Sequence, residues 1–314
     1  MRLTAQNLPS VLAVALFALM FAFGSFSYTG FFAGQVFLNL LIDNAFVLIV
    51  AVGMTFVILS GGIDLSVGSI VALTTMALAW GVERAHVPAW VMVPVLLVGG
   101  TLFGAGMGCV IQFFRIPAFI VTLAGMFLAR GLCYLISIDS IAINDPALTA
   151  WSQLRIPVGP LGQVSPGVVI AVAVGIVLAH RTAFGRNVYA IGGNERSALL
   201  MGLPVAPTRI AVYALSGFCA TLGGVVFGIY TLSGYGLHAL GLELDAIAAA
   251  VIGGVSTAGG VGTVAGMLTG VLIFQVLDNG LVILGVSPYW QQIVKGTIIV
   301  AAVAIDIRKY VTRK

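Results

Sequence analysis

The feature that most constrains this chain is a succession of long apolar runs separated by short polar or Gly/Pro-rich breaks. Several runs approach the ~20 residues that an α-helix needs to cross a hydrocarbon core of ~30 Å. Of the 314 residues, 60% are hydrophobic and only 8% are charged, against roughly 45–50% and 25% in a soluble domain. So few charges cannot cover a surface that faces water. Because the runs are continuous and do not alternate, the sequence predicts an all-α membrane protein and not a β-barrel.

The runs predict about ten transmembrane helices in one membrane domain that covers residues 1–314. They lie near residues 10–29, 38–60, 65–81, 90–113, 117–137, 165–180, 209–232, 243–256, 262–280 and 290–307. A cleaved signal peptide is the alternative for the first run. That run is longer than the ~7–15 apolar residues of a usual signal peptide, which favours a retained span.

The distribution of Lys and Arg predicts the orientation. In the ten-span arrangement, most of the 14 basic residues fall on one side: Arg2, Arg115, Arg181, Arg186, Arg196, Arg209, Arg308, Lys309, Arg313 and Lys314. Only Arg84 and Arg155 fall on the other side. The positive-inside rule therefore places both termini and the 181–208 loop in the cytoplasm. The net charge is +4, but the basic residues are scattered between apolar spans. They therefore do not indicate a nucleic-acid surface.

Two Gly-interrupted breaks resemble each other. Leu59 to Leu65 reads LSGGIDL, and a second stretch opens with LSG at Leu232 and ends with LDAI at Ile247. The preceding spans run in opposite directions, so the two halves would be inverted repeats, which are typical of transporters with broken helices.

Polar side chains in or beside the spans are the candidates for a gate or a substrate pathway. They are Asn44, Asp64, Gln112, Glu243, Asp245, Gln275 and Asn279. For the acidic residues near predicted helix starts, which also include Asp43, N-capping is the competing interpretation. For the amides, hydrogen bonding between helices competes.

Two cations, Arg130 and Lys295, fall within spans, where a charge costs ~2.5–3.5 kcal/mol at the bilayer centre. They must face protein, water or an interface, and Asp278 or Asn279 could pair with Lys295. No metal-ligand spacing, nucleophile system or P-loop is visible, so we expect neither an enzyme nor a cofactor on this chain. We expect Gly104 to Gly108 to allow close helix packing.

The 181–208 loop contains a short amphipathic helix over 194–202, capped by Asn194 and ended by Gly202. On its own the pattern also fits an interfacial helix near anionic headgroups.

This loop resembles the cytoplasmic loop of ABC-type sugar permeases of the ribose/xylose class, through Phe184 to Asn194 and Ser197 to Gly202. Residues 196–202 are similar to the coupling pattern Glu-Ala-Ala-x-x-x-Gly of these permeases, although Arg196 replaces the Glu and Ser197 the first Ala. The resemblance extends over nearly the whole chain, through residues 52–69, 116–126 and 243–248. Residues 43–46 and 189–194 are most similar to galactofuranose permeases.

The resemblance implies a ten-helix permease of the vitamin B12 importer-like (type II) arrangement in the bacterial inner membrane. It implies a second permease chain, an ABC ATPase that binds ATP and Mg²⁺, and a periplasmic sugar-binding protein as partners. It further implies that the coupling segment includes Arg186, Asn194, Arg196, Ser197, Ala198 and Gly202. An ion-coupled secondary transporter of a small polar solute stays open as the alternative, because broken helices serve both classes.

Overall fold

The computed structural model describes residues 18–19, 22–23, 26, 34–157, 163–164, 166–283 and 285–311. The predicted first span, 10–29, therefore lies almost entirely outside the described residues. The helices are α2 (Gly34–Asp43), α3 (Ala45–Leu59), α4 (Val67–Glu83), α5 (Ala89–Phe114), α6 (Ala118–Ile136), α7 (Pro146–Ser152), α8 (Pro166–Arg181), α9 (Ala183–Gly193), α10 (Glu195–Leu200), α11 (Val205–Thr231), α12 (Leu242–Ile252), α13 (Val264–Ile283) and α14 (Pro288–Val311). Two antiparallel ladders of two residues complete the described fold: β1 (Ile141–Ala142) with β4 (Ser233–Gly234), and β2 (Ile156–Pro157) with β3 (Gln163–Val164).

Four of the described helices are long and apolar enough to cross a membrane: α5, α6, α11 and α13. Helices α3 and α4 are also apolar but are shorter. The chain is therefore a helical membrane protein, as its composition predicts.

Helix α3 forms the centre of the molecule. Its sequence is apolar on every side, and all of its residues except Phe46 are buried. A helix without a polar face must be surrounded by other helices. Helices α11, α12 and α8 pack around it, which places the end of α3 and the break that follows it in the protein interior.

Small residues allow α5 and α11 to approach closely. A Cβ atom added at Gly104 would overlap the backbone carbonyl of Tyr213, and one added at Gly217 would overlap that of Gly100. A Cβ atom at Gly108 would come within 2.9 Å of the Ile210 Cα. This confirms the predicted close packing through Gly104 and Gly108.

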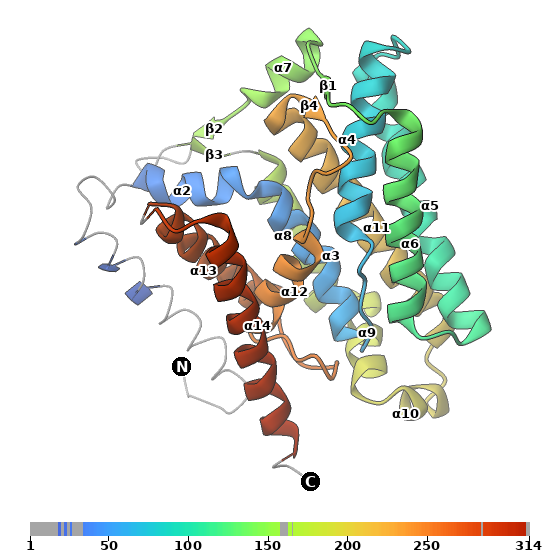
Figure 1. Cartoon of the computed structure of the whole chain (residues 1–314). Helices are drawn as coiled ribbons and strands as arrows, with labels where there is room; N and C mark the ends of the chain where they lie inside the picture. The colour runs from blue at the N-terminus through green and yellow to red at the C-terminus, as the bar shows by residue number, and fades with distance from the viewer. Residues whose placement is uncertain are drawn as a thin grey trace.

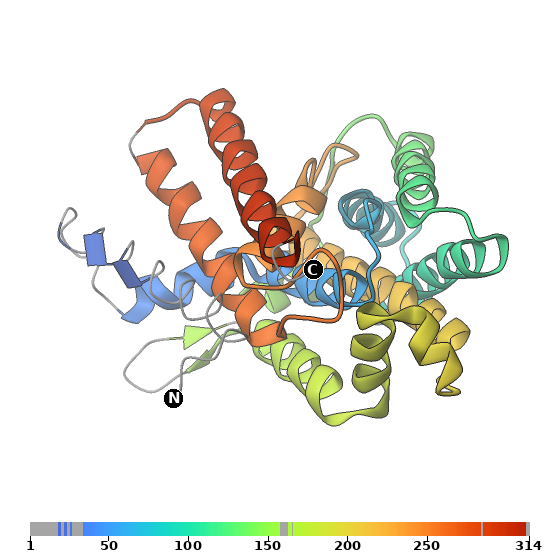
Figure 2. The same cartoon turned by 90° about the horizontal axis from the view of Figure 1, so that it is seen from below.

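The turns and short helices that connect the long helices lie at two opposite ends of the bundle. The α5–α6 turn, α9, α10 and the end of α14 lie at the lower end in Figure 1, and the α4–α5 turn and α7 lie at the upper end. Figure 2, viewed from the lower end, shows α5 and α6 on one flank and α13 and α14 on the other, with α3 between them. Arg115, at the C-cap of α5, thus lies at the same end as Arg186 on α9 and Arg196 on α10.

Three predicted segments differ from the structure in where their helices begin and end. The run 38–60 is divided at Asn44 into α2 and α3, because Asn44 leaves helical geometry (φ −114°, ψ 21°). Helix α12 ends at Ile252, and residues 253–263 form a Gly-rich loop. The 181–208 loop holds two helices, because α9 precedes the predicted one.

The N-cap interpretation of the acidic residues is wrong. Asn44, Ser66 and Gly241 are the N-cap residues of α3, α4 and α12. Asp64 lies two residues before the cap of α4, and Asp245 lies inside the first turn of α12.

Candidate functional site

Helix α10 stands at the lower end of the bundle as a short, fully capped helix. The Asn194 Oδ1 accepts a hydrogen bond from the Ser197 backbone N–H (2.8 Å). At the other end, Gly202 has a left-handed backbone (φ +74°). Its N–H donates to the Leu199 carbonyl (3.0 Å), and the Leu203 N–H donates to the Ala198 carbonyl (3.0 Å). These two bonds form a Schellman motif, so both ends of the predicted helix are stabilised as the sequence indicates.

One face of α10 packs against its neighbouring helices, and the end of the helix is exposed. Ala198 is completely buried in a small apolar cluster with Ile191 of α9 and Val205 of α11. In contrast, the residues that end the helix are strongly exposed: Leu199 at 60%, Leu200 at 84% and Met201 at 67%. We call Leu199, Leu200 and Met201 the apolar tip. Adjacent exposed apolar side chains at the end of an anchored helix are typical of a protein contact surface.

Arg209 connects α10 to the bundle. Its guanidinium forms an ion pair with Glu195 (2.6 Å) in the first turn of α10 and donates to the Gln112 Oε1 (3.0 Å) near the end of α5. Gln112 and Glu195 of α10 therefore share Arg209 as a partner. Three other residues of the predicted segment, Arg186, Arg196 and Ser197, are exposed on the surface of α9 and α10.

Helix α9 is held from the side of the bundle interior. The Tyr189 hydroxyl donates to the Gly262 carbonyl in the α12–α13 loop (2.8 Å). Burial raises the pKa of the Tyr189 phenol above its ordinary value, so the hydroxyl keeps its proton as a donor. The Thr182 hydroxyl caps the N-terminus of α9 by accepting from the Gly185 N–H (3.1 Å).

The buried carboxylate of Asp64 accepts hydrogen bonds within the first break, residues 60–66. Asp64 is fully buried and accepts three hydrogen bonds: from the Ser66 N–H (2.9 Å), from the Ser66 hydroxyl (2.6 Å) and from the Ser216 hydroxyl of α11 (2.7 Å). Three donors satisfy most of the demand of a carboxylate that has lost its water. Asp64 thus fastens the 60–66 break to α11.

The second break is fastened from α6 and from the β1 segment. The Arg130 Nη1 donates to the carbonyls of Gly236 (2.6 Å) and His238 (3.0 Å). The β1–β4 ladder continues in a bond from the Ile143 N–H to the Leu232 carbonyl (2.8 Å). The intramembrane arginine thus has a positioning role for the segment between α11 and α12.

The two breaks meet at the start of α4. The Glu243 Oε2 and the Ala239 carbonyl lie so close to Gly68 that a Cβ atom there would overlap the carboxylate. Asp64 lies just before the same helix start. The structure thus brings two of the predicted pathway residues to the N-terminus of α4, whose dipole favours negative charge.

A second polar cluster joins α12, α13 and α14. The Lys295 Nζ lies 2.8 Å from a carboxylate oxygen of Asp278 and 3.6 Å from one of Asp245. The Lys295 side chain is 13% exposed, and the side chains of Asp278 and Asp245 are 27% and 31% exposed. The expected partnership of Lys295 with Asp278 is confirmed. Gln275 and Asn279 lie on the same helix as Asp278, the former half-buried and the latter exposed.

Asn44, another of the predicted pathway residues, lies at the junction of α2 and α3. Within the described residues, no three His, Cys, Asp or Glu side chains gather closely enough to hold a metal ion.

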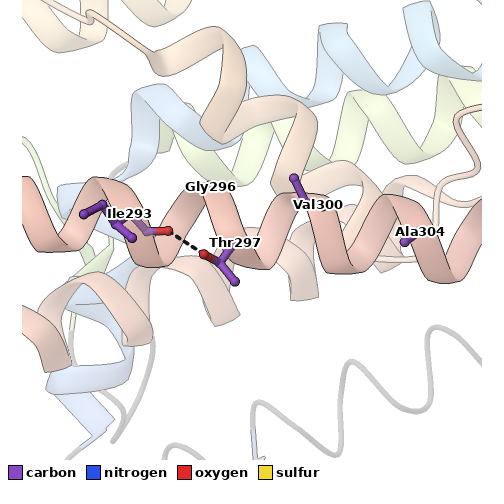
Figure 3. A pocket seen from close by; sticks show the side chains of 5 residues that line it. All are labelled: Ile293, Gly296, Thr297, Val300 and Ala304. Carbon is purple, nitrogen blue, oxygen red and sulfur yellow. Dashed lines mark hydrogen bonds between the residues drawn. The ribbon is translucent and has the colours of Figure 1, made fainter.

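An open groove of about 530 Å³ runs along α14 (Figure 3), lined by Ile293, Gly296, Thr297, Val300 and Ala304. The Thr297 hydroxyl is already bonded to the Ile293 carbonyl (2.8 Å). The groove offers almost no polar groups, so it suits helix or lipid packing better than a polar ligand.

Sequence reasoning missed Arg209 as a connector and left Arg130 without a partner. The sequence signal for the partners of Arg130 is the free-energy cost of placing a charge in the membrane. An arginine inside an apolar run needs hydrogen-bond acceptors, and an interrupted segment provides free carbonyls. No comparable signal marked Arg209, because a basic residue at a cytoplasmic helix end is expected for topology alone.

Comparison with known proteins identifies the family of the chain. The family model of the branched-chain amino acid transport system permease component matches residues 36–303. The inner membrane ABC transporter permease protein YjfF of Escherichia coli K12 is 47% identical over 305 residues, covering 96% of this chain and 92% of the relative. The ribose import permease protein RbsC of the same strain is 40% identical and covers 89% of this chain and 88% of the relative.

The galactose/methyl galactoside import permease protein MglC of Salmonella typhimurium is 36% identical, covering 88% of this chain and 87% of the relative. No solved structure matches the chain significantly. The chain therefore belongs to the family of ABC transporter permease components, among relatives that include sugar import permeases.

Proposed function

We propose that this chain is the transmembrane permease subunit of an ATP-driven ABC importer that moves a monosaccharide, galactofuranose or another small sugar, from the periplasm to the cytoplasm. The observation that carries the proposal is α10: a capped helix with a buried base and an exposed apolar tip, at the end of the bundle where basic residues gather. Relatives named for ribose and galactose import support the substrate class. The resemblance of residues 43–46 and 189–194 supports galactofuranose.

The proposed partners follow from the same arrangement. The apolar tip, with Arg186, Arg196 and Ser197 around it, contacts an ATPase subunit that binds ATP and Mg²⁺. A second permease chain, either identical or a sibling, completes the membrane part. A periplasmic sugar-binding protein delivers the sugar at the opposite end. The chain itself is not an enzyme, and free energy enters through the ATPase.

The proposed topology has ten spans in the bacterial inner membrane, with both termini in the cytoplasm. The placement of α9 and α10 at the same end as the α5–α6 turn supports it, because their basic residues follow the positive-inside rule. Two breaks, each followed by a helix of 17 or fewer residues (α4 and α12), support an inverted-repeat arrangement of the vitamin B12 importer type.

Within this scheme the polar residues at the breaks line or gate the pathway. Asp64 precedes the start of α4, Glu243 lies against Gly68 in its first turn, and Asp245 lies 3.6 Å from Lys295. ATP-driven movement of α10 would shift these broken segments between an outward-open and an inward-open state.

Uptake of labelled sugar into proteoliposomes that hold the permease, its ATPase and the binding protein tests the proposal. Uptake should need ATP inside the vesicle and should stop with vanadate. Uptake that continues without ATP and follows an ion gradient would identify a secondary transporter instead. A panel of monosaccharides offered to the cognate binding protein tests the choice of galactofuranose.

A further inference from the structure

Three glycine-bearing turns from distant parts of the chain meet beside α9. They are Gly61, just after α3; Gly192, next to the last residue of α9; and Gly259 and Gly260, in the α12–α13 loop. We call this contact the glycine junction. It lies at the lower end of the bundle, where Figure 2 shows the α12–α13 loop beside α9 and the end of α3.

The junction is a contact of backbone on backbone. The Gly260 N–H donates to the Leu59 carbonyl (2.9 Å). A Cβ atom at Gly192 would overlap that same carbonyl oxygen and would lie 2.6 Å from the Gly260 nitrogen. A Cβ atom at Gly259 would lie 2.8 Å from the Gly192 carbonyl oxygen and 3.0 Å from the Gly61 Cα. No flexible side chain separates the three turns, so none can absorb a displacement of one against the others.

Each turn leads to a different part of the proposed mechanism. Gly192 is the next-to-last residue of α9, three residues before α10 begins. Leu59 ends α3 and is followed by the break that holds Asp64. The α12–α13 loop follows α12, which carries Glu243 and Asp245. The hydroxyl of Tyr189 ties α9 to the same loop a second time, through the Gly262 carbonyl.

We infer that the glycine junction transmits displacement of α9 and α10 to the ends of both α3 and α12, and that Gly192 and Gly260 are positioning residues for coupling. The inference rests on the proposed function for what is coupled, ATP hydrolysis to sugar movement. Its geometric part, one mechanical unit made of three turns, stands independently. A direct backbone contact reaches both broken segments at once, which a single salt bridge between two side chains does not.

The chain offers a matched control for the test. Gly192 and Gly193 are adjacent, yet a Cβ atom at Gly193 would meet nothing within 4 Å. We therefore compare Gly192→Ala with Gly193→Ala. A third variant, Tyr189→Phe, removes one hydrogen bond of the junction without adding volume, and it keeps the test valid if Gly192→Ala does not fold.

Two measurements separate the failure of the junction from the failure of the proposed function. The first is hydrogen exchange of residues 253–263 in the permease reconstituted in nanodiscs, which requires no transport. Exchange should rise in Gly192→Ala and in Tyr189→Phe and should match the wild type in Gly193→Ala. Wild-type exchange in both Gly192→Ala and Tyr189→Phe would overturn the junction.

The second measurement is the number of sugars taken up per ATP hydrolysed by the whole transporter in proteoliposomes. This ratio should fall by about tenfold in Gly192→Ala, within the range of coupling between distant sites, and should stay at the wild-type value in Gly193→Ala. If the wild-type transporter shows no ATP-driven uptake, the proposed function fails while the exchange result stands. If uptake is normal and the ratio is equal in both alanine variants, the coupling role is refuted.

Discussion

The left-handed residue that ends α10 allows a quantitative prediction. Gly202 has φ +74°, and a Cβ atom at this position would meet nothing within 4 Å. Gly202→Ala therefore introduces no clash and acts only on the backbone. Because the two Schellman bonds depend on this conformation, the substitution weakens the end of α10 and the apolar tip with it.

The magnitude follows from two opposing terms. An L-residue in the left-handed region costs about 1–2 kcal/mol. The lower entropy of alanine in the unfolded segment returns ~0.4–1 kcal/mol. The net loss in local stability is about 1 kcal/mol, which corresponds to a roughly fivefold increase in the open population of α10. Gly202→Pro should have a larger effect, because proline fixes φ near −65° and cannot donate to the Leu199 carbonyl.

Hydrogen exchange of residues 194–204, followed by mass spectrometry in nanodiscs, measures this opening directly. Gly193→Ala is the control, since it also places a methyl group in open space but at a residue without positive φ. Exchange should rise roughly fivefold in Gly202→Ala and remain at the wild-type rate in the control. Equal rates in the two variants would show that the Schellman bonds do not hold α10. In the assembled transporter, Gly202→Pro should also reduce sugar uptake per ATP.

Three further substitutions test the other contacts. Asp278→Asn should lower the thermal midpoint of the purified permease more than Asp245→Asn. Only the contact of Lys295 with Asp278 is within hydrogen-bond distance, and such a charged hydrogen bond contributes about 1.5–3 kcal/mol. Equal losses in the two variants would contradict the assigned pairing. Arg130→Lys keeps the charge but shortens the donor, so hydrogen exchange in the segment between α11 and α12 should rise, and an unchanged rate would rule out the positioning role. Ala198→Leu overpacks the cluster under α10 and should cost about 1–3 kcal/mol in the free energy of unfolding of that unit, whereas a neutral result would mean that α10 is only loosely seated.

Much of α10 could be predicted because its signals are local. An Asn whose side-chain oxygen accepts from the N–H three residues later, and a Gly just past the last turn, define both ends of a short helix. Asn194 and Gly202 occupy these positions in the structure. The repeated glycines of α5 likewise indicate close packing before the partner helix is known, and α11 proved to be that partner.

The predictions that failed depend on contacts distant in sequence. Asp64 looks like an N-cap in its own segment, yet one of its oxygens is bonded to Ser216, 152 positions away. For Gln112, the sequence offers hydrogen bonding between helices as one interpretation, and its bond from Arg209 of α11 is such a contact, but no local signal identifies that partner. The division of the second span at Asn44 also escaped detection, because long apolar runs lie on both sides of Asp43 and Asn44. Hydropathy measures the cost of exposure to water and carries no information on where an apolar run bends.

The structure gives a physical reason why the breaks can exist within an apolar bundle. A chain that leaves helical geometry there exposes backbone N–H and C=O groups that lipid cannot satisfy. At the first break, Asp64 provides the acceptors for Ser66, and Ser216 satisfies the second carboxylate oxygen. At the second break, Arg130 provides the donors for two free carbonyls. An anion serves the break that presents an N–H donor and a cation serves the break that presents carbonyls. Exchanging the two charges would therefore leave both breaks unsatisfied, although the composition of the chain would be the same.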